Sequence, residues 1–274
     1  MIPRAFAYER PTSVADAAGL LRTHGEGARI LAGGHSLLPM MKLRLAAPET
    51  LIDIGGISSL RGVSDAGAHI VIGALTTHAD VAGPDIMRSA CPILAQAAAG
   101  VGDMQVRNRG TIGGSLAQAD PHGDLPTVLL ALDGDVSAEG PDGIRTIAAA
   151  DLFLGFLTTS LRPDEILTGV RVPKAANGAY VKFNRRAQDW AIVGVAAVTG
   201  DTPGVALVNM GSTPVRATAV EQRLAGGSSP AEAAEVADNG TDPPSDLNAT
   251  PEFRRHLARV LTRRALERAA GGTQ

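Results

Sequence analysis

Two glycine pairs, each with a serine one or two residues after it, restrict what this chain can fold into more than any other feature of its sequence. Glycine has no Cβ, so backbone N–H groups in such a loop can approach a phosphate closely, and a neighbouring hydroxyl can bond to it. Two loops of this kind could hold one dinucleotide from both sides. The alternative for each pair is a tight turn or a close contact between strands. The residues are Ala32, Gly33, Gly34, His35 and Ser36 in the first loop and Thr111, Ile112, Gly113, Gly114 and Ser115 in the second.

The more familiar nucleotide-binding patterns are absent from the sequence. Neither glycine pair has the G-x-G-x-x-G spacing of a Rossmann domain, and no G-x-x-x-x-G-K-[ST] phosphate loop occurs. The six histidines show neither H-x-x-x-H nor H-E-x-x-H spacing, so a zinc site has little support. A nicotinamide-binding Rossmann domain and a P-loop domain are therefore both disfavoured.

Charge and cysteine content exclude further classes of protein. The 274 residues include 25 Lys and Arg against 28 Asp and Glu, and the net charge of −3 offers nucleic acid no broad basic surface. The single cysteine, Cys91, cannot form an internal disulfide or a thiolate cage for zinc or an iron–sulfur cluster. No apolar run approaches the roughly 18 residues of a membrane span. The lone thiol and the charged N-terminal stretch favour a cytoplasmic protein.

Helical and strand-like patterns alternate along the chain and predict an α+β fold. A mixed region extends to about residue 175, a strand-then-helix region follows it, and Pro173 to Gly178 is the best linker candidate. Helices are expected at 14–24, 89–99 and 125–132, and from near Arg216, Pro230 and Pro251. Strands are expected just before the first glycine pair and at 51–54, 68–75, 134–138, 144–148, 165–172, 179–183, 192–199 and 205–210.

Five segments of the sequence carry a resemblance to one protein family. They are AGGHSLLPMMKLRLAAPETLIDIG, GDMQVRNRGTIGGSLAQADPHGDLP, AYVKFNRRAQDWAIVGVAA, NMGSTPVRATAVE and PPSDLNATPEFRRHLARVLTRRAL. In order and spacing they resemble the FAD-binding medium subunit of carbon monoxide dehydrogenase and related molybdenum hydroxylases, over nearly the whole chain. Departures are small: Ser115 stands where many relatives carry Asn, and Gln118 stands where they often carry His.

The resemblance implies both a fold and a cofactor. Residues 1–175 are expected to form a two-subdomain FAD-binding domain of the xanthine dehydrogenase and vanillyl-alcohol-oxidase (PCMH) type. Residues 178–274 are expected to form a small C-terminal α+β flavoprotein domain. In that family the two glycine loops hold the FAD pyrophosphate, so Ala32 to Ser36 and Thr111 to Ser115 carry over as direct matches.

Three further positions match residues that contact the cofactor in relatives. Asp124 has a carboxylate suited to a ribose hydroxyl or an adenine amine, and the alternative is an N-cap for the helix at Leu125. Leu167 is an apolar match. Lys182 could stabilise negative charge on the reduced flavin, and the alternative is a solvated strand lysine. No catalytic acid–base residue and no metal ligand is expected.

The resemblance also implies a role within a complex. The chain would carry FAD and pass electrons from the [2Fe–2S] clusters of a small subunit to an external acceptor, while a large subunit would hold the molybdenum cofactor. The expected assembly is a dimer of heterotrimers. Two alternatives remain: a stand-alone FAD-dependent oxidoreductase of the same fold, and a flavin-free scaffold subunit.

Other candidates in the sequence are weaker. Cys91 precedes Pro92 at a helix start, where a thiolate could be stabilised, but a buried, inert thiol is the commoner outcome. The resemblance puts Asp189 and Trp190 toward the flavin side without assigning them a role. The last helix is expected to be amphipathic. Its apolar stripe would be Phe253, Leu257, Val260 and Leu261, and its solvated face or partner-docking surface would be Arg254, Arg255, Arg259, Arg263, Arg264 and Arg268.

Overall fold

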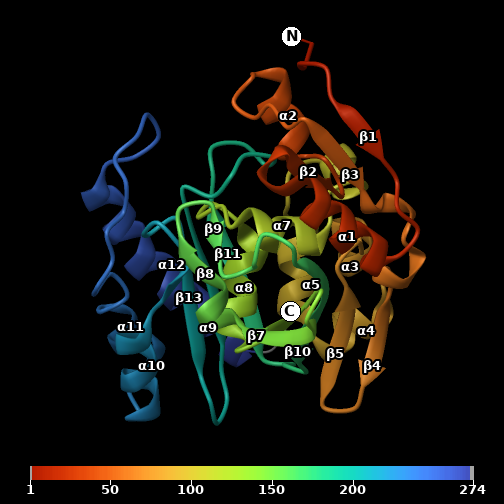
Figure 1. Ribbon diagram of the computed structural model, residues 1–274. Helices are drawn as coiled ribbons and strands as arrows, with labels where there is room; N and C mark the ends of the chain where they lie inside the picture. Colours follow the sequence, from red (N-terminus) through yellow and green to blue (C-terminus); the bar gives the residue numbers. More distant parts are fainter. Residues whose placement is uncertain (1, 272–274) are drawn as a thin grey trace.

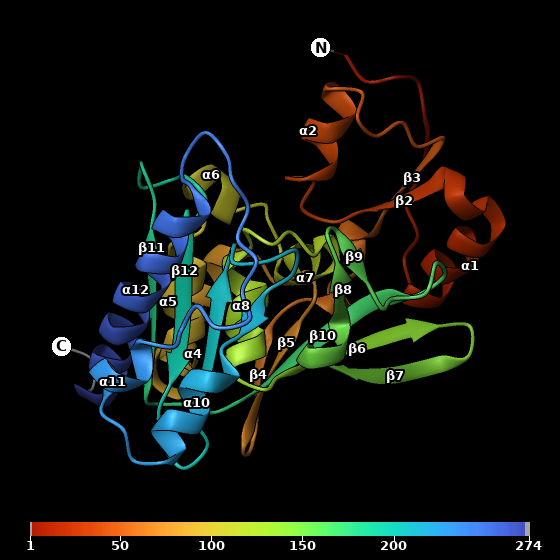
Figure 2. The same cartoon turned by 90° about the vertical axis from the view of Figure 1, so that its left-hand side faces the viewer.

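The computed structural model describes residues 2–271, and within that range the strands form four sheets (Figure 1). Figure 2 shows how the chain is layered. Residues 7–60 lie at one side, residues 178–271 lie at the other, and residues 63–173 lie between them. The predicted α+β class is confirmed.

Residues 7–60 form a small parallel sheet with helical connections. The elements are β1 (Ala7–Glu9), α1 (Val14–His24), η1 (Gly25–Gly27), β2 (Ala28–Leu31), α2 (Leu37–Lys42), β3 (Thr50–Asp53), η2 (Ile54–Gly56) and η3 (Ser58–Leu60). The strand order is β1-β3-β2, and both outer strands run parallel to β3. Ser13 caps α1 by accepting a hydrogen bond from the Asp16 N–H at 3.1 Å. The first glycine loop therefore joins β2 to α2.

Residues 63–173 form a five-stranded antiparallel sheet with helices packed against it. The strand order is β4-β5-β10-β6-β7, and β8 and β9 form a separate hairpin. The strands are β4 (Val63–Ala66), β5 (His69–Gly73), β6 (Asp135–Gly140), β7 (Gly143–Ala148), β8 (Phe153–Gly155), β9 (Thr158–Thr159) and β10 (Ile166–Pro173). The helices are α3 (His78–Ala82), α4 (Asp85–Ala90), α5 (Pro92–Ala99), α6 (Met104–Arg107), α7 (Ile112–Gln118), α8 (Asp124–Ala131) and α9 (Ala149–Leu152).

Residues 178–271 form an antiparallel sheet covered on both faces. The elements are β11 (Gly178–Phe183), β12 (Val193–Val198), β13 (Gly204–Val208), β14 (Val215–Arg216), α10 (Thr218–Ala225), α11 (Pro230–Ala234) and α12 (Pro251–Gly271). Helix α12 packs on β11 and β12, while α5 and α8 of the preceding region also pack on this sheet. Because both faces are covered, β12 and β13 are almost continuously apolar instead of alternating.

Residues before and after the segment 173–178 contribute to one hydrophobic core. Leu94 and Val128 belong to the same buried cluster as Ala196 and Val208. The predicted linker is itself tied down, because Ala175 N–H donates to the Ala90 carbonyl at 2.9 Å. The two halves of the chain therefore share packing and are not joined by a free tether.

Two predictions about helices are wrong. The single helix expected at 89–99 is two helices, α4 and α5, separated at Cys91. Pro92 lacks an N–H and restricts the preceding residue, and Cys91 takes φ −147° and ψ 63°. In α12, Arg254 is fully buried instead of solvated, while Phe253, predicted to belong to the apolar stripe, is 43% exposed.

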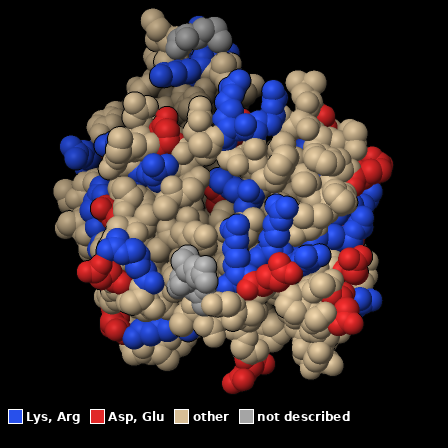
Figure 3. All heavy atoms as spheres, turned by 180° about the vertical axis from the view of Figure 1, so that it is seen from behind, with Lys and Arg blue, Asp and Glu red and all other residues tan. Residues whose placement is uncertain are grey.

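The net charge of −3 does not describe every face of the molecule. On the face seen in Figure 3, Lys and Arg side chains lie around the middle, and most Asp and Glu side chains lie nearer the edge. No helix within residues 2–271 combines the length and the apolar character that crossing a bilayer requires.

Candidate functional site

The two glycine loops lie against each other, although almost eighty residues of sequence separate them. A Cβ added to Gly33 would lie 2.3 Å from the carbonyl oxygen of Arg109 and 2.8 Å from Cα of Gly110. Gly110 directly precedes the second loop. Gly33 is therefore required by the close approach of two backbones, and that contact brings the predicted loops into one site.

The first loop presents unused backbone donors. Gly34 has a φ of +79°, a left-handed conformation that glycine adopts without strain. Among the hydrogen bonds of residues 2–271, none has the N–H of Gly34, His35 or Ser36 as its donor. The side chains of His35 and Ser36 are exposed. This loop can therefore offer several N–H groups and a hydroxyl to an anion.

The second loop uses its N–H groups within the chain. Ile112 N–H donates to the Thr76 carbonyl at 3.0 Å, and Gly113 N–H donates to the Ala74 carbonyl at 2.9 Å. Thr111 caps α7, because its Oγ1 accepts from Gly114 N–H at 3.1 Å. Any contribution of this loop to a ligand is therefore expected from the Ser115 hydroxyl.

A histidine that sequence reasoning missed lies beneath the meeting point of the loops. His78 is 5% exposed, and a Cβ on Gly110 would come within 2.8 Å of its ring. Its backbone N–H donates to the Gly110 carbonyl at 2.9 Å. Burial, together with the nearby His35 and Arg107, lowers the pKa of His78 to about 4. His78 is therefore a neutral packing residue, and lone histidines give no sequence signal for such a role.

Asp124 and Lys182 form a buried ion pair. The Lys182 Nζ lies 2.8 Å from Asp124 Oδ2 and donates to the Gly100 carbonyl at 2.7 Å. The Asp124 side chain is 7% exposed and that of Lys182 is 12% exposed, so a solvated strand lysine is excluded. The N-cap alternative for Asp124 is also wrong, because Asp124 is the first residue inside α8 and Gly123 is the cap position.

A third residue completes this pair and was also missed. The Tyr180 hydroxyl donates to Asp124 Oδ1 at 2.5 Å, so each carboxylate oxygen has its own donor. Burial raises the pKa of Asp124, while the Lys182 ammonium and the Tyr180 hydroxyl oppose that rise. Burial and the adjacent carboxylate raise the pKa of Tyr180 well above its usual value. The tyrosine therefore remains a hydrogen-bond donor.

The remaining predicted residues are buried in the core. Leu167 lies on β10, is 5% exposed and belongs to the central hydrophobic cluster, on a strand against which α7 packs. Cys91 is fully buried, and burial raises the pKa of its thiol to about 11. The alternative of a stabilised thiolate at Cys91 is therefore wrong.

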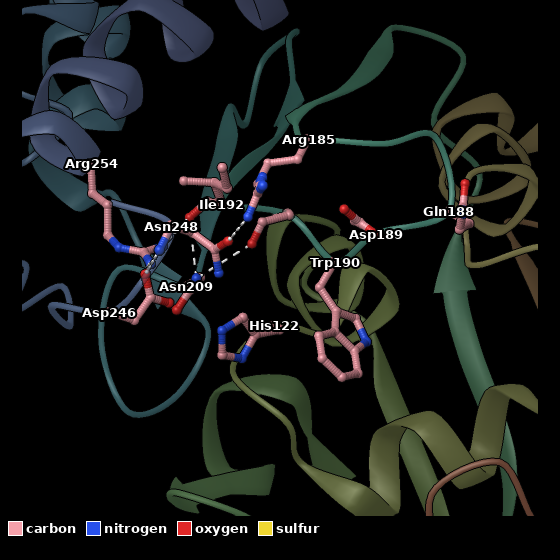
Figure 4. A pocket seen from close by; sticks show the side chains of 11 residues that line it. His122, Arg185, Gln188, Asp189, Trp190, Ile192, Asn209, Asp246, Asn248 and Arg254 are labelled. Carbon is pink, nitrogen blue, oxygen red and sulfur yellow. Dashed lines mark hydrogen bonds and ion pairs between the residues drawn. The ribbon is translucent and has the colours of Figure 1, made fainter. Parts of the chain in front are cut away.

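A cavity of about 340 Å³ lies at the end of β11, and none of its lining residues belongs to the glycine loops. Figure 4 shows His122 beside Trp190, with Arg254, Asn209 and Asp246 grouped together. The His122 and Trp190 ring centroids are 6.1 Å apart. Arg254 Nε donates to the Pro244 carbonyl at 3.0 Å, and its Nη2 lies 2.7 Å from Asp246 Oδ1. The buried Arg254 thus holds the segment that contains Pro244 and Asp246 at one side of this cavity.

Comparisons with known proteins bear on the whole chain. The family described as FAD binding domain in molybdopterin dehydrogenase matches residues 4–175, and the family described as CO dehydrogenase flavoprotein C-terminal domain matches residues 178–269. The carbon monoxide dehydrogenase medium chain of Hydrogenophaga pseudoflava is 41% identical to this chain over 98% of each. The chain belongs to the FAD-binding medium subunits of molybdenum hydroxylases.

Solved structures of related enzymes contain chains with the same fold as this medium subunit. A chain of carbon monoxide dehydrogenase from Hydrogenophaga pseudoflava, in a form lacking the Mo-pyranopterin moiety, matches with a TM-score of 0.94 at 42% identity over 99% of each chain. A chain of quinoline 2-oxidoreductase from Pseudomonas putida 86 matches with a TM-score of 0.93 at 32% identity over the full length of both. The predicted two-part FAD fold is confirmed, and FAD is the cofactor of this oxidoreductase subunit.

Within residues 2–271 no group of three or more His, Cys, Asp or Glu side chains could hold a metal ion. The residues described above do fit a flavin nucleotide. The first loop has free backbone donors suited to a pyrophosphate, and a cationic side chain is held in place on β11.

Proposed function

We propose that this medium subunit passes electrons from [2Fe–2S] clusters of a small partner subunit, by way of FAD, to an external acceptor. Substrate would be oxidised at a molybdenum cofactor in a large partner subunit. When bound, FAD supplies a redox centre that accepts two electrons and returns them singly or in pairs. The expected assembly is a dimer of heterotrimers, and the cytoplasmic location stays a prediction.

The full-length similarity to carbon monoxide dehydrogenase medium chains carries this proposal, and Cys91 limits where the electrons can come from. It is the only cysteine of the chain, it is fully buried, and its thiol has a pKa raised to about 11. Such a thiol can neither form a disulfide nor ligate a cluster within this chain. Electrons for the flavin must therefore come either from a partner or from a substrate bound directly at the flavin.

We further propose how the residues divide the work of holding FAD, within an FAD-binding domain of residues 1–175 and a C-terminal domain of residues 178–274. Ala32 to Ser36 would bind the pyrophosphate through backbone N–H groups, and Thr111 to Ser115 would complete that site with the Ser115 hydroxyl. Lys182 would face the isoalloxazine. An ammonium has three donors, and two of those of Lys182 are used by Asp124 and Gly100, so one remains.

Asp124 has a different role from the one suggested by its chemistry alone. Both of its oxygens already accept from Tyr180 and Lys182, and the side chain is 7% exposed. We therefore propose that Asp124 orients Lys182 and does not bind the ribose. Leu167 would act through the apolar packing beneath α7.

The test uses this chain with FAD and then the complete complex. The FAD-loaded chain alone is mixed, without oxygen, with aldehydes, purines or carbon monoxide while flavin absorbance is followed. No bleaching is expected until both partner subunits are added. Native purification should recover those partners with molybdenum and iron. Flavin reduction by substrate and this chain alone would favour the stand-alone oxidoreductase instead.

A further inference from the structure

Tyr180 is a buried polar residue to which the cofactor site above gives no role. It is 5% exposed, lies in the central hydrophobic cluster, and buries its hydroxyl against the Asp124 carboxylate. Its backbone N–H donates to the Gln96 side chain at 3.0 Å. A phenylalanine would fill the same apolar space, so the packing does not explain why this position needs a hydroxyl.

The local structure aims Tyr180 and Lys182 at the same target. They are two residues apart on β11, so their side chains leave the same face of the strand. Asp124, on the first turn of α8, receives both: Tyr180 on Oδ1 and Lys182 on Oδ2. The two donors hold the carboxylate from two sides, which fixes the direction in which Lys182 points.

The electrostatics of a buried carboxylate make the second donor important. A hydrogen bond to a charged group in a site with little water is stronger than one between neutral groups, and an unpaired buried oxygen is costly. The Tyr180 hydroxyl withdraws part of the negative charge that Asp124 would otherwise direct at Lys182. More of the ammonium's positive potential then extends toward a third acceptor.

We propose that Tyr180 is a positioning residue that sets the electrostatic effect of Lys182 on the flavin by donating to Asp124. The inference rests on the proposed function, in which Lys182 faces the isoalloxazine. Tyr180 does not touch the flavin in this proposal and acts only through the carboxylate.

The first test is the two-electron reduction potential of FAD in the full chain carrying Tyr180→Phe. Removing the hydroxyl leaves Asp124 more negative, so the equilibrium constant for flavin reduction should fall about tenfold, which corresponds to a potential about 30 mV lower. Lys182→Met should lower the potential as well. Tyr8→Phe is the matched control, because Tyr8 also donates to a carboxylate, that of Asp53, but does so in the N-terminal sheet. The control should leave the potential unchanged.

A double-mutant cycle separates this role from a structural one. If Tyr180 acts through the charge of Asp124, its effect should largely disappear in the Asp124→Asn background. There, Tyr180→Phe should change the equilibrium constant for flavin reduction less than twofold. A shift of the same size in both backgrounds would overturn the proposal. So would an unchanged potential in Tyr180→Phe when Lys182→Met lowers it. An unchanged potential in Lys182→Met with full FAD occupancy would overturn the role of Lys182 and this inference together.

A second measurement does not remove the side chain at all. The chain has two tyrosines, so 3-fluorotyrosine incorporated into the Tyr8→Phe variant labels Tyr180 alone. A more acidic phenol donates a stronger hydrogen bond, so the potential should rise, opposite in sign to the change in Tyr180→Phe. A fall or no change would contradict the proposal.

Discussion

At the residue scale, the missing side chain of Gly33 allows the two glycine loops to touch. The space for a Cβ is filled by the Arg109 carbonyl at 2.3 Å and by Gly110. Because both obstacles are backbone, neither can move aside by changing a rotamer. The contact between residues 33 and 109–110 therefore depends on a single hydrogen atom in place of a methyl group.

We predict that Gly33→Ala separates the loops. Overpacking against backbone should cost about 1–3 kcal/mol in the free energy of unfolding and should weaken FAD binding at the same time. Urea unfolding and FAD titration by fluorescence measure the two effects. Gly19→Ala is the control: Gly19 lies in α1 with nothing within 4 Å of an added Cβ, so this change should stabilise the chain by about 0.5–1 kcal/mol. Normal FAD affinity in Gly33→Ala would contradict the prediction.

His78 makes the stability of the chain depend on pH. Its pKa is about 4 in the folded chain, against an ordinary value of 6.5 that applies when the chain unfolds. The unfolded state therefore binds the extra proton first, and stability is lost as the pH falls below about 6.5. The loss should approach about 3 kcal/mol near pH 4. Between pH 7 and pH 4, the unfolding free energy of wild type should fall more steeply with decreasing pH than that of His78→Gln. Equal pH dependence in the two proteins would refute this role.

At the element scale, a buried carboxylate joins β7 to the turn before β10. Glu165 accepts from Arg145 Nε at 2.6 Å, from Arg145 Nη2 at 2.7 Å and from the Arg162 backbone N–H at 2.7 Å. Its side chain is 4% exposed. The Arg145 guanidinium lowers the pKa of Glu165, so this carboxylate stabilises the fold above its ordinary pKa and ceases to do so as the solution becomes acidic.

We predict that Glu165→Gln lowers the free energy of unfolding at pH 7 by about 1.5–3 kcal/mol, the range for hydrogen bonds to charged groups. The difference from wild type should shrink as the pH falls through the acidic range. Glu267→Gln is a suitable comparison, because Glu267 pairs with Arg263 on the exposed side of α12 and should cost about 0.5 kcal/mol or less. Equal losses for the two variants would show that burial of Glu165 adds nothing.

Elements with a strong apolar pattern, periodic or continuous, were predictable and short ones were not. Helix α1 and strands β12 and β13 follow their patterns closely. Helices α3, α6 and α7 have four to seven residues, too few for a helical period to stand out, and β4 is mostly exposed and shows no alternation. The glycine loops were found from residue type alone. Tyr180 was not, because its partner Asp124 lies 56 residues away and no local pattern records that contact.

At the scale of the whole molecule, the core shared across residues 173–178 makes the two halves interdependent. Helix α8 packs against β12 and β13, helix α5 packs against β11, and their buried residues share one cluster with those of the C-terminal sheet. Removing either half would expose an apolar face of the other. The regions matched by the two families, residues 4–175 and 178–269, therefore pack together as one unit.

We predict a single cooperative unfolding transition for the chain, despite its two-part organisation. Calorimetric and van't Hoff enthalpies should agree, and FAD should raise the midpoint of that one transition by mass action. Val208→Ala, which opens a cavity in the shared core, should shift the whole transition downward without splitting it. Two resolved calorimetric peaks would indicate that the halves unfold separately.

The ion pair between Asp124 and Lys182 has a consequence for how such subunits change over generations. Asp124 comes from the first half and Lys182, with Tyr180, from the second. A recombination event that joined halves from two ancestors would leave a lone buried charge unless the donors and the carboxylate arrived together. Selection should therefore act on these three residues together. Grafting a foreign C-terminal half onto this chain should give a folded protein only when that half carries a tyrosine and a lysine at the positions of Tyr180 and Lys182.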